Sequence, residues 1–418
     1  MDCFAARFLS LSKGAMTGCR THGESRHCEE PARATWQSKL IKEVFMKKRT
    51  FHFFFLLASF FILTISFYLI SCSSVKKQTW DVSEIINSKY SNFTGAADSF
   101  LSEMGFQGAV LVGRGDKIVF AKGYGVCDEK AEPADLVPIG INTTFEAGSI
   151  TKQMTAAAVM QLVEKKKLSV NDKLSKFFPD FEAGEKITIE MLLNMRSGLT
   201  DHINSADDFF PKNVYRRIEI KQMACEPVEE NLVLEYLKQA PLLAEPDSTY
   251  FYCNTNYYLL AKIIEKVSGM TFHNYIQKNI FDRCGMTHSN LEFQKTDTRG
   301  YDYKGRYYSI PASLALGCGD VNSCVTDLFK WNNLFTSGKI VKKKSFKKMI
   351  DSESYGYGVY CHEGSIFHTG VTNVFNSYDG FYFDDKLSII VLSNCPAAKV
   401  NTTTIARNLQ KMWVEKNK

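Results

Sequence analysis

A chain of 418 residues, 45% hydrophobic and 23% charged, has the composition of a globular protein, which excludes intrinsic disorder for most of its length. The formal charge of +6 is modest and forms no basic stripe with interleaved aromatic residues, so we expect no nucleic-acid partner. The 12 cysteines include no C-x-x-C pair, and H-E-x-x-H is absent, so we expect no metal and no cofactor. Cys318 and Cys324 could form a disulfide, whereas most thiols are expected to be small buried apolar groups.

The sequence that ends at Cys72 has the features of an export signal. Lys-Lys-Arg at residues 47–49 precedes an uncharged, mainly apolar run over residues 51–71. The tetrapeptide Leu-Ile-Ser-Cys resembles a bacterial lipoprotein signal, in which Cys72 is lipidated; an uncleaved membrane anchor is the alternative. Both alternatives predict an extracytoplasmic protein held at a membrane, in the periplasm or at the cell surface.

The export signal divides the chain into segments. Because such signals normally begin at the first residue, we hypothesise that translation starts at Met46 and that residues 1–45 are a mis-assigned extension. Residues 46–72 are then the signal peptide or anchor, and residues 73–99 a linker and first amphipathic helix. Residues 100–418 remain for the main domain, which is long enough to bury a sizeable core.

Strand patterns occur at both ends of this domain and helix patterns between them. Apolar runs at residues 108–112 and 117–124 flank Gly-Arg-Gly-Asp and predict a hairpin. Helical spacing of apolar residues from Ile150 to Leu162 predicts a helix that follows Ser149. The same reasoning predicts helices over residues 188–195, 229–239, 257–267, 272–280, 327–334 and 401–416, and strands over 355–361, 365–368, 375–383 and 387–393.

These elements predict an α/β fold of the α+β kind. The strands from the N- and C-terminal parts are expected to share one antiparallel sheet flanked by helices, with an all-helical inserted subdomain beside it. A junction between two subdomains is a favoured place for a pocket.

The first candidate for chemistry is Ser149-Ile150-Thr151-Lys152, at the start of the apolar helix. Residues three apart on a helix share a face, so the hydroxyl and the amine are expected to meet. A serine hydroxyl needs such a neighbour to remove its proton. S-x-x-K alone is weak, since it also begins at Ser10, Ser73, Ser74 and Ser345, and only the context favours Ser149.

Two further motifs follow along the chain. Tyr252-Cys253-Asn254 precedes an apolar helix, and Tyr252 could serve as a base only if a cation such as Lys152 lowers its pKa. His368-Thr369-Gly370 ends a strand-like run, where a glycine lets the backbone approach a ligand closely. A tyrosine capped by a hydrogen bond and a simple turn are the alternative interpretations.

In this order and spacing, the three motifs resemble the serine β-lactamase and penicillin-binding protein family, in the branch of class C β-lactamases, D-Ala-D-Ala carboxypeptidases and related esterases. The stretches at residues 191–199 and 317–323 also match that branch. The resemblance implies a β-lactamase/transpeptidase-like fold, an acyl-serine intermediate and no metal.

The resemblance also implies a role for each residue. Ser149 is the nucleophile, and Lys152 and Tyr252 activate it and pass its proton to the leaving group, with the identity of the base left open. The expected substrate-binding residues are Asn254, His368, Thr369 and Gly370, and the expected oxyanion hole is formed by the backbone N–H groups of Ser149 and Val371.

The predicted function is that of a D-Ala-D-Ala carboxypeptidase acting on peptidoglycan-type peptides. A carboxylesterase with the same machinery, a β-lactamase and a catalytically silent ligand-binding or sensor protein are the alternatives. His368 stands where class C β-lactamases have Lys, which disfavours antibiotic hydrolysis. Residues 371–376 are bulkier and more polar than the glycines usual in the family, which affects the expected width of the acyl-side pocket.

Overall fold

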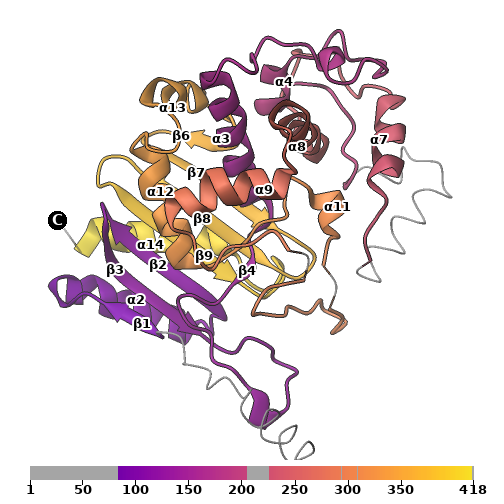
Figure 1. Ribbon diagram of the computed structural model, residues 1–418. Helices are drawn as coiled ribbons and strands as arrows, with labels where there is room; N and C mark the ends of the chain where they lie inside the picture. The colour runs from indigo at the N-terminus through magenta and orange to yellow at the C-terminus, as the bar shows by residue number, and fades with distance from the viewer. Residues whose placement is uncertain (1–82, 205–225, 293, 308, 417–418) are drawn as a thin grey trace, which may run out of the picture. The chain divides into compact units, whose positions relative to one another are not determined.

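A seven-stranded antiparallel sheet runs through the computed structural model, which describes residues 83–204, 226–292, 294–307 and 309–416 (Figure 1). These residues belong to one unit, Thr79–Lys418. The strand order is β1-β3-β2-β9-β8-β7-β6. The strands are β1 (Glu84–Ile86), β2 (Gly108–Arg114), β3 (Lys117–Tyr124), β6 (Tyr360–His362), β7 (Ser365–Val371), β8 (Asn376–Tyr382) and β9 (Leu387–Ser393).

The N-terminal hairpin is joined to the last strand of the chain. Strand β2 pairs with β9, so that Ala109 lies opposite Leu392. This pairing confirms the prediction that both ends of the domain share one antiparallel sheet.

Alternating apolar side chains give the sheet two buried faces. Ile389 and Val391 of β9 pack with Trp413 and its neighbours on the face covered by α2 (Ser91–Glu103) and α14 (Thr402–Lys416) (Figure 1). Ile390 and Leu392 belong to the larger core on the opposite face. A strand that is buried on both faces has a mainly apolar sequence in place of a strict alternation of apolar and polar residues, as β9 does.

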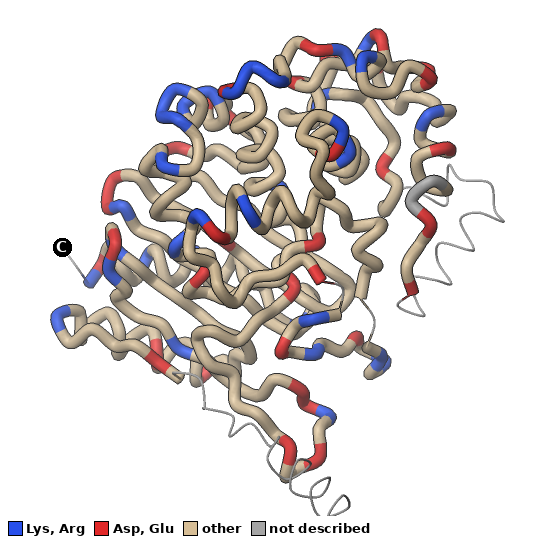
Figure 2. Tube along the Cα trace, in the orientation of Figure 1, with Lys and Arg blue, Asp and Glu red and all other residues tan. Residues whose placement is uncertain are grey.

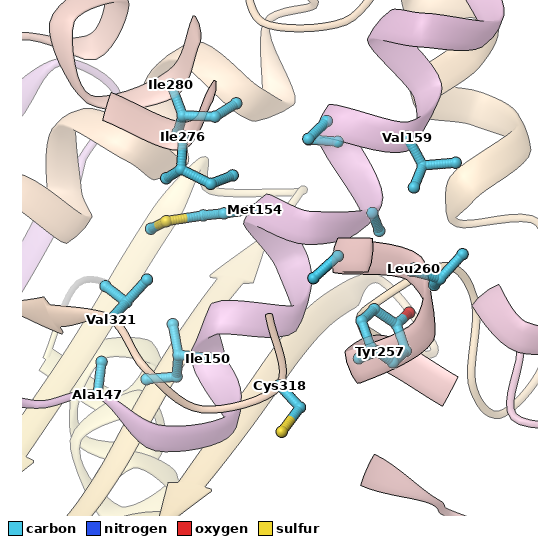
Figure 3. Packing of buried hydrophobic residues seen from close by; sticks show 14 of the residues in the cluster. Ala147, Ile150, Met154, Val159, Tyr257, Leu260, Ile276, Ile280, Cys318 and Val321 are labelled. Carbon is cyan, nitrogen blue, oxygen red and sulfur yellow. The ribbon is translucent and has the colours of Figure 1, made fainter. Parts of the chain in front are cut away.

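The larger core surrounds α3 (Thr151–Glu164), which packs against α8 (Asn254–Ser268) and α9 (Phe272–Ile276). Ile150, Met154 and Val159 pack here among residues of several other elements (Figure 3). The structure also contains η3 (Gly148–Ile150), β4 (Phe145–Glu146), β5 (Asn322–Ser323), α4 (Ile189–Leu193), α7 (Glu230–Lys238), the π-helical turn η5 (Gln277–Phe281), α10 (Asp282–Cys284), α11 (Ala312–Ala315), α12 (Val325–Thr336) and α13 (Lys343–Met349).

Most predicted elements are confirmed, but several differ. The helix expected over residues 272–280 changes to a π-helical turn after Ile276. The strand expected over residues 355–361 is reduced to β6, since a Cβ atom on Gly358 would lie 2.4 Å from Lys152 O and the chain turns there with a φ of +76°. Strand β1 and helix α13 were not predicted. Helix α2 begins before residue 100, where the main domain was expected to start, yet it packs on the sheet of that domain.

The proposed disulfide between Cys318 and Cys324 is wrong, because both thiols are free. All seven cysteines in the described segments are buried, as expected of small apolar groups. The proposed extension, export signal and lipidated Cys72 lie outside the described residues. None of the helices in the described part of the chain has the length and apolar character needed to span a bilayer.

Candidate active site

The turn that carries Ser149 is pressed against strand β7. Ser149 lies in η3, directly before α3, and Gly148 beside it has a φ of +54°, which favours glycine. A Cβ atom on Gly370 would lie 2.0 Å from Ala147 O and 2.2 Å from Ser377 Oγ. Glycine at position 370 therefore lets the third motif approach the nucleophile.

Lys152 is fully buried and lies within hydrogen-bonding distance of Ser149. Its Nζ is 2.9 Å from Ser149 Oγ. The same nitrogen donates to Asn254 Oδ1 at 2.8 Å and to Cys318 O at 2.7 Å. Burial lowers the pKa of Lys152, because a charged amine is costly away from water. As a neutral amine, Lys152 can satisfy both carbonyl oxygens with N–H bonds and keep its lone pair for the Ser149 hydroxyl.

Tyr252 contacts the same serine oxygen from another side. Its hydroxyl donates to Ser149 Oγ at 2.9 Å, and Lys152 Nζ lies 5.0 Å from the centre of its ring. Burial raises the pKa of Tyr252 well above its usual value, so the phenol keeps its proton. The expectation that Lys152 lowers this pKa is therefore not met, because loss of solvent outweighs any attraction.

Asn254 links Lys152 to a buried carboxylate that the sequence did not reveal. Asn254 Nδ2 donates to Asp201 Oδ2 at 2.9 Å, and Asn254 N donates to the same oxygen at 3.0 Å. Asp201 is 1% exposed and also accepts from the backbone N–H groups of Ile203 and Asn204. Asn254 lines the cavity described below, yet its side-chain oxygen is already used by Lys152. The signal for Asp201 was its position just after the family-like stretch 191–199.

His368 is buried and electrically neutral. Its Nδ1 lies 2.6 Å from Thr369 O, and its Nε2 lies 3.1 Å from Tyr355 Oη. The carbonyl oxygen can only accept, so Nδ1 carries the ring proton and Nε2 accepts from Tyr355. Burial lowers the pKa of His368 to about 3. The ring therefore lines the site without bringing a positive charge to it.

A cavity of about 440 Å³ opens over these side chains. Blue and red segments are scattered over the mostly tan described trace (Figure 2), but the described residues that line this cavity include no Lys, Arg, Asp or Glu. A Cβ atom on Gly148 would lie 3.2 Å from the backbone nitrogen of Val371, so the two expected oxyanion donors come from adjoining segments. The lining comprises Gly148, Ser149, Ile203, Asn204, Tyr252, Asn254, Ile310, Ala315, Cys318, Gly319, Tyr360, His368, Thr369, Val371, Thr372 and Asn373.

The two family-like stretches hold the motifs in place. Within residues 317–323, Gly317 O accepts from Thr155 Oγ1 at 2.7 Å and Val321 N donates to Thr151 Oγ1 at 3.0 Å, which fixes α3 beside the Lys152 contact. Within residues 191–199, Leu193 O accepts from Tyr257 Oη at 2.7 Å, which fixes the start of α8. Both stretches therefore fix the helices that carry Lys152 and Asn254.

One group of side chains in the described segments has the composition of a metal site. Ligand atoms of His288, Cys324 and Asp327 all lie within 4.8 Å of one another. Lys330 Nζ already lies 2.7 Å from Asp327 Oδ1, and Ser289 donates to the other carboxylate oxygen. We interpret this group as structural, because a lysine ammonium already neutralises its only carboxylate.

Comparison with known proteins agrees with this geometry. The sequence profile described as Beta-lactamase matches residues 95–410. The chain belongs to the beta-lactamase family. It is a serine hydrolase of that family, in agreement with the resemblance drawn from the motifs.

Three family relatives indicate the range of activities around this fold. PbpX of Bacillus subtilis (strain 168), whose name assigns it to the penicillin-binding proteins, is 31% identical over 71% of this chain and 72% of its own length. The teichoic acid D-alanine hydrolase of Staphylococcus aureus (strain MRSA252) is 26% identical over 78% of this chain and 80% of its own. The octameric penicillin-binding protein homologue from Pyrococcus abyssi matches with a TM-score of 0.64 and 27% identity over 78% and 77% of the two chains.

Proposed function

We propose that this protein hydrolyses D-alanyl ester or amide bonds through an acyl-Ser149 intermediate. The observation that carries the proposal is the pair of contacts to one oxygen: Lys152 Nζ and Tyr252 Oη each lie 2.9 Å from Ser149 Oγ. A hydroxyl held between a buried amine and a protonated phenol is activated for nucleophilic attack. The name of the teichoic acid D-alanine hydrolase supports the D-alanyl group as the acyl part.

Lys152 is the base in this proposal. Because Tyr252 keeps its proton and donates to Ser149 Oγ, the serine proton is free to turn toward Lys152 Nζ, and burial favours the neutral form of that amine, which could accept it. Lys152 takes that proton as Ser149 Oγ attacks the carbonyl carbon. The backbone N–H groups of Ser149 and Val371 stabilise the oxygen that becomes negative.

The leaving group departs with a proton from the Tyr252 hydroxyl, and Lys152 returns the serine proton to Tyr252. Water then attacks the acyl-Ser149 ester with the same two groups acting in reverse, which releases the acid and restores the serine. Every proton removed is thus returned within the cluster of three side chains.

The substrate next to the reacting bond is uncharged in this proposal. Because His368 is neutral and the described lining contributes no Lys or Arg, the free carboxylate of a D-Ala-D-Ala peptide finds no cationic partner among the described residues of the cavity. Burying an unpaired carboxylate is costly. A D-alanyl ester or a carboxylate-free amide avoids that cost. The D-Ala-D-Ala carboxypeptidase predicted from the motifs remains the second candidate, favoured by the similarity to PbpX.

The test measures how fast the purified protein hydrolyses different substrates. We expect turnover of D-alanyl esters, free or N-acetylated, with a transient acyl adduct on Ser149 by mass spectrometry. N-acyl-D-Ala-D-Ala should be cleaved at least roughly tenfold more slowly, as expected when a charge lacks a partner. Ser149→Ala should abolish turnover, whereas Ser345→Ala, in the other described S-x-x-K sequence, should retain it. Ester turnover that survives Ser149→Ala contradicts the proposal.

We also propose, from the sequence, that the protein acts outside the cytoplasm as a lipoprotein joined to the membrane through Cys72. Residues 1–45 are then absent from the native precursor, and the hydrolase domain follows a short linker. Metabolic labelling with a fatty acid should mark the wild type and miss Cys72→Ala. Peptides from residues 1–45 in the native precursor would contradict the proposed start at Met46.

A further inference from the structure

The lysines are spread along the sequence, but the fold brings two of their runs together. Residues 165–167 are all lysine and follow the end of α3, and residues 342–344 are all lysine at the start of α13. Lys342 N donates to Glu164 Oε1 at 2.6 Å, so the two runs lie side by side. Together with Lys347 they form a group that we call the lysine face, over α13 and the adjoining end of α3 (blue in Figure 2).

The lysine face is exposed because α13 is held by its apolar side. Phe346 and Met349 of this helix are buried in the larger core, whereas all lysines of the face are exposed. The neighbouring Lys348 forms an ion pair with Glu190 at 3.2 Å. The lysines of the face form no ion pair with any carboxylate in the described parts of the chain. Their ammonium groups are therefore available to an anionic partner.

The positions of these charges lower the stability of α13. Lys343 and Lys347 are four residues apart and are therefore neighbours on the helix surface, where like charges repel. The first turn of α13 carries no acidic residue, although the start of a helix favours negative side chains. Lysines at the end of α3, by contrast, are favourable for that helix. Charges that oppose the stability of their own helix are better explained by a bound partner than by folding.

The chemistry of the lysine face restricts its partner to an anionic polymer. A lysine ammonium is a point charge that pairs readily with phosphate. Several of them on one surface attract a chain of repeated negative charges, because its condensed counterions are released on binding. The aromatic ring of α13, Phe346, is buried and cannot stack on a base. This disfavours single-stranded nucleic acid, whose bases stack on exposed aromatic side chains.

The place of the lysine face in the fold disfavours a bilayer as its partner. Met349 O accepts from Tyr357 N at 2.8 Å, which places the end of α13 beside the segment that leads into β6. Strands β6 and β1 are the opposite edges of the seven-stranded sheet (Figure 1). Six strand spacings of about 4.8 Å separate these edges by roughly 29 Å. A protein tethered through the segment before β1, as proposed above, carries its lysine face at the edge remote from the tether.

We propose that the lysine face is a docking surface for a linear polyanion, a soluble polymer of repeated phosphate groups. The described residues that line the cavity of Ser149 include none of its lysines, so this surface is separate from the catalytic site. The inference goes beyond the proposed hydrolysis and does not depend on it. Docking would hold the protein on a polymer while the cavity stays open to substrate.

The test uses the purified full-length protein and fluorescently labelled long-chain inorganic polyphosphate, with binding followed by anisotropy. With about four phosphate contacts, binding to the wild type should weaken roughly 10²-fold between about 50 and 200 mM salt. The triple change Lys343→Gln, Lys344→Gln and Lys347→Gln should weaken binding at the lower salt concentration at least roughly tenfold and flatten its salt dependence. Arg at the same three positions should keep the binding.

The matched control removes the same charge from exposed lysines elsewhere. It replaces Lys89, Lys117 and Lys386 by Gln and should bind polyphosphate as the wild type does. The melting temperature of the α13 triple variant should not fall, because the change removes like-charge repulsion. Its turnover of a D-alanyl ester should equal that of the wild type.

The outcomes that overturn the inference are distinct from those that overturn the proposed function. Equal weakening in the two triple variants means that net charge alone attracts the polymer, and it overturns the lysine face. Absence of polyphosphate binding overturns the proposal, also where the same lysines bind phosphatidylglycerol vesicles. Tighter binding of a single-stranded oligonucleotide of equal charge overturns the class of partner. Failure to hydrolyse any D-alanyl ester overturns the proposed function and leaves the binding results standing.

Discussion

Replacement of Gly370 by alanine tests whether the close approach of β7 to the nucleophile turn is needed for catalysis. The added Cβ atom would lie 2.0 Å from Ala147 O, whereas ordinary contact begins at 3.4 Å, so the strand and the turn must separate by about 1.4 Å. Val371 and Ser149 would move apart with them. A displacement of about 1 Å costs roughly 10²-fold in rate, and loss of one oxyanion donor costs a similar factor. Overpacking should also lower the free energy of unfolding by about 1–3 kcal/mol.

The assay measures kcat/KM with a D-alanyl ester and follows unfolding by circular dichroism. Gly95→Ala is the matched control, because no heavy atom lies within 4 Å of a Cβ atom placed there, in helix α2. We expect this control to keep full activity and to be more stable by up to about 1 kcal/mol. If Gly370→Ala folds and its kcat/KM stays within about threefold of wild type, the reasoning about the close approach is refuted.

Two other predictions concern buried ionisable groups. Lys152→Met should lower kcat/KM by roughly 10³-fold, while Lys348→Met at the other described S-x-x-K should not. Because Lys152 acts as the neutral amine, wild-type kcat/KM should rise with pH through its pKa, and a rate independent of pH would contradict this. Burial raises the pKa of Glu146 to about 7, so the folded state holds a proton that the unfolded state has released. Its stabilising contribution, about 3 kcal/mol, should be lost as pH rises from 4.5 to about 7, and Glu146→Gln should flatten that part of the curve of melting temperature against pH.

The helices and strands that could be predicted from the sequence are those whose residue pattern is local. The hairpin, the helix after Ser149 and the last strands are recognisable because their apolar residues repeat at the period of each element. The order of the motifs around Ser149, Tyr252 and His368 led to the family, and the structure brings these side chains to one cavity.

What the sequence did not reveal depends on tertiary burial. Nothing local shows that His368 loses its charge, because its pKa is lowered mainly by burial among residues of distant segments. Asp201 lies far along the chain from Lys152 and is linked to it by hydrogen bonds through Asn254. The alternation of aromatic residues and glycines before Tyr360 suggested a strand, but close backbone contacts at Gly358 require a turn instead.

The pairing of the first hairpin with the last strand has a consequence for the growing chain. Ser393 Oγ donates to Gln107 O across 286 residues, so this edge of the sheet stays open until synthesis is almost finished. Contacts that close such long loops form late, and an open hairpin edge can pair with other chains meanwhile. Premature termination before β9 should therefore yield an aggregating fragment, whereas the finished chain covers that edge by itself.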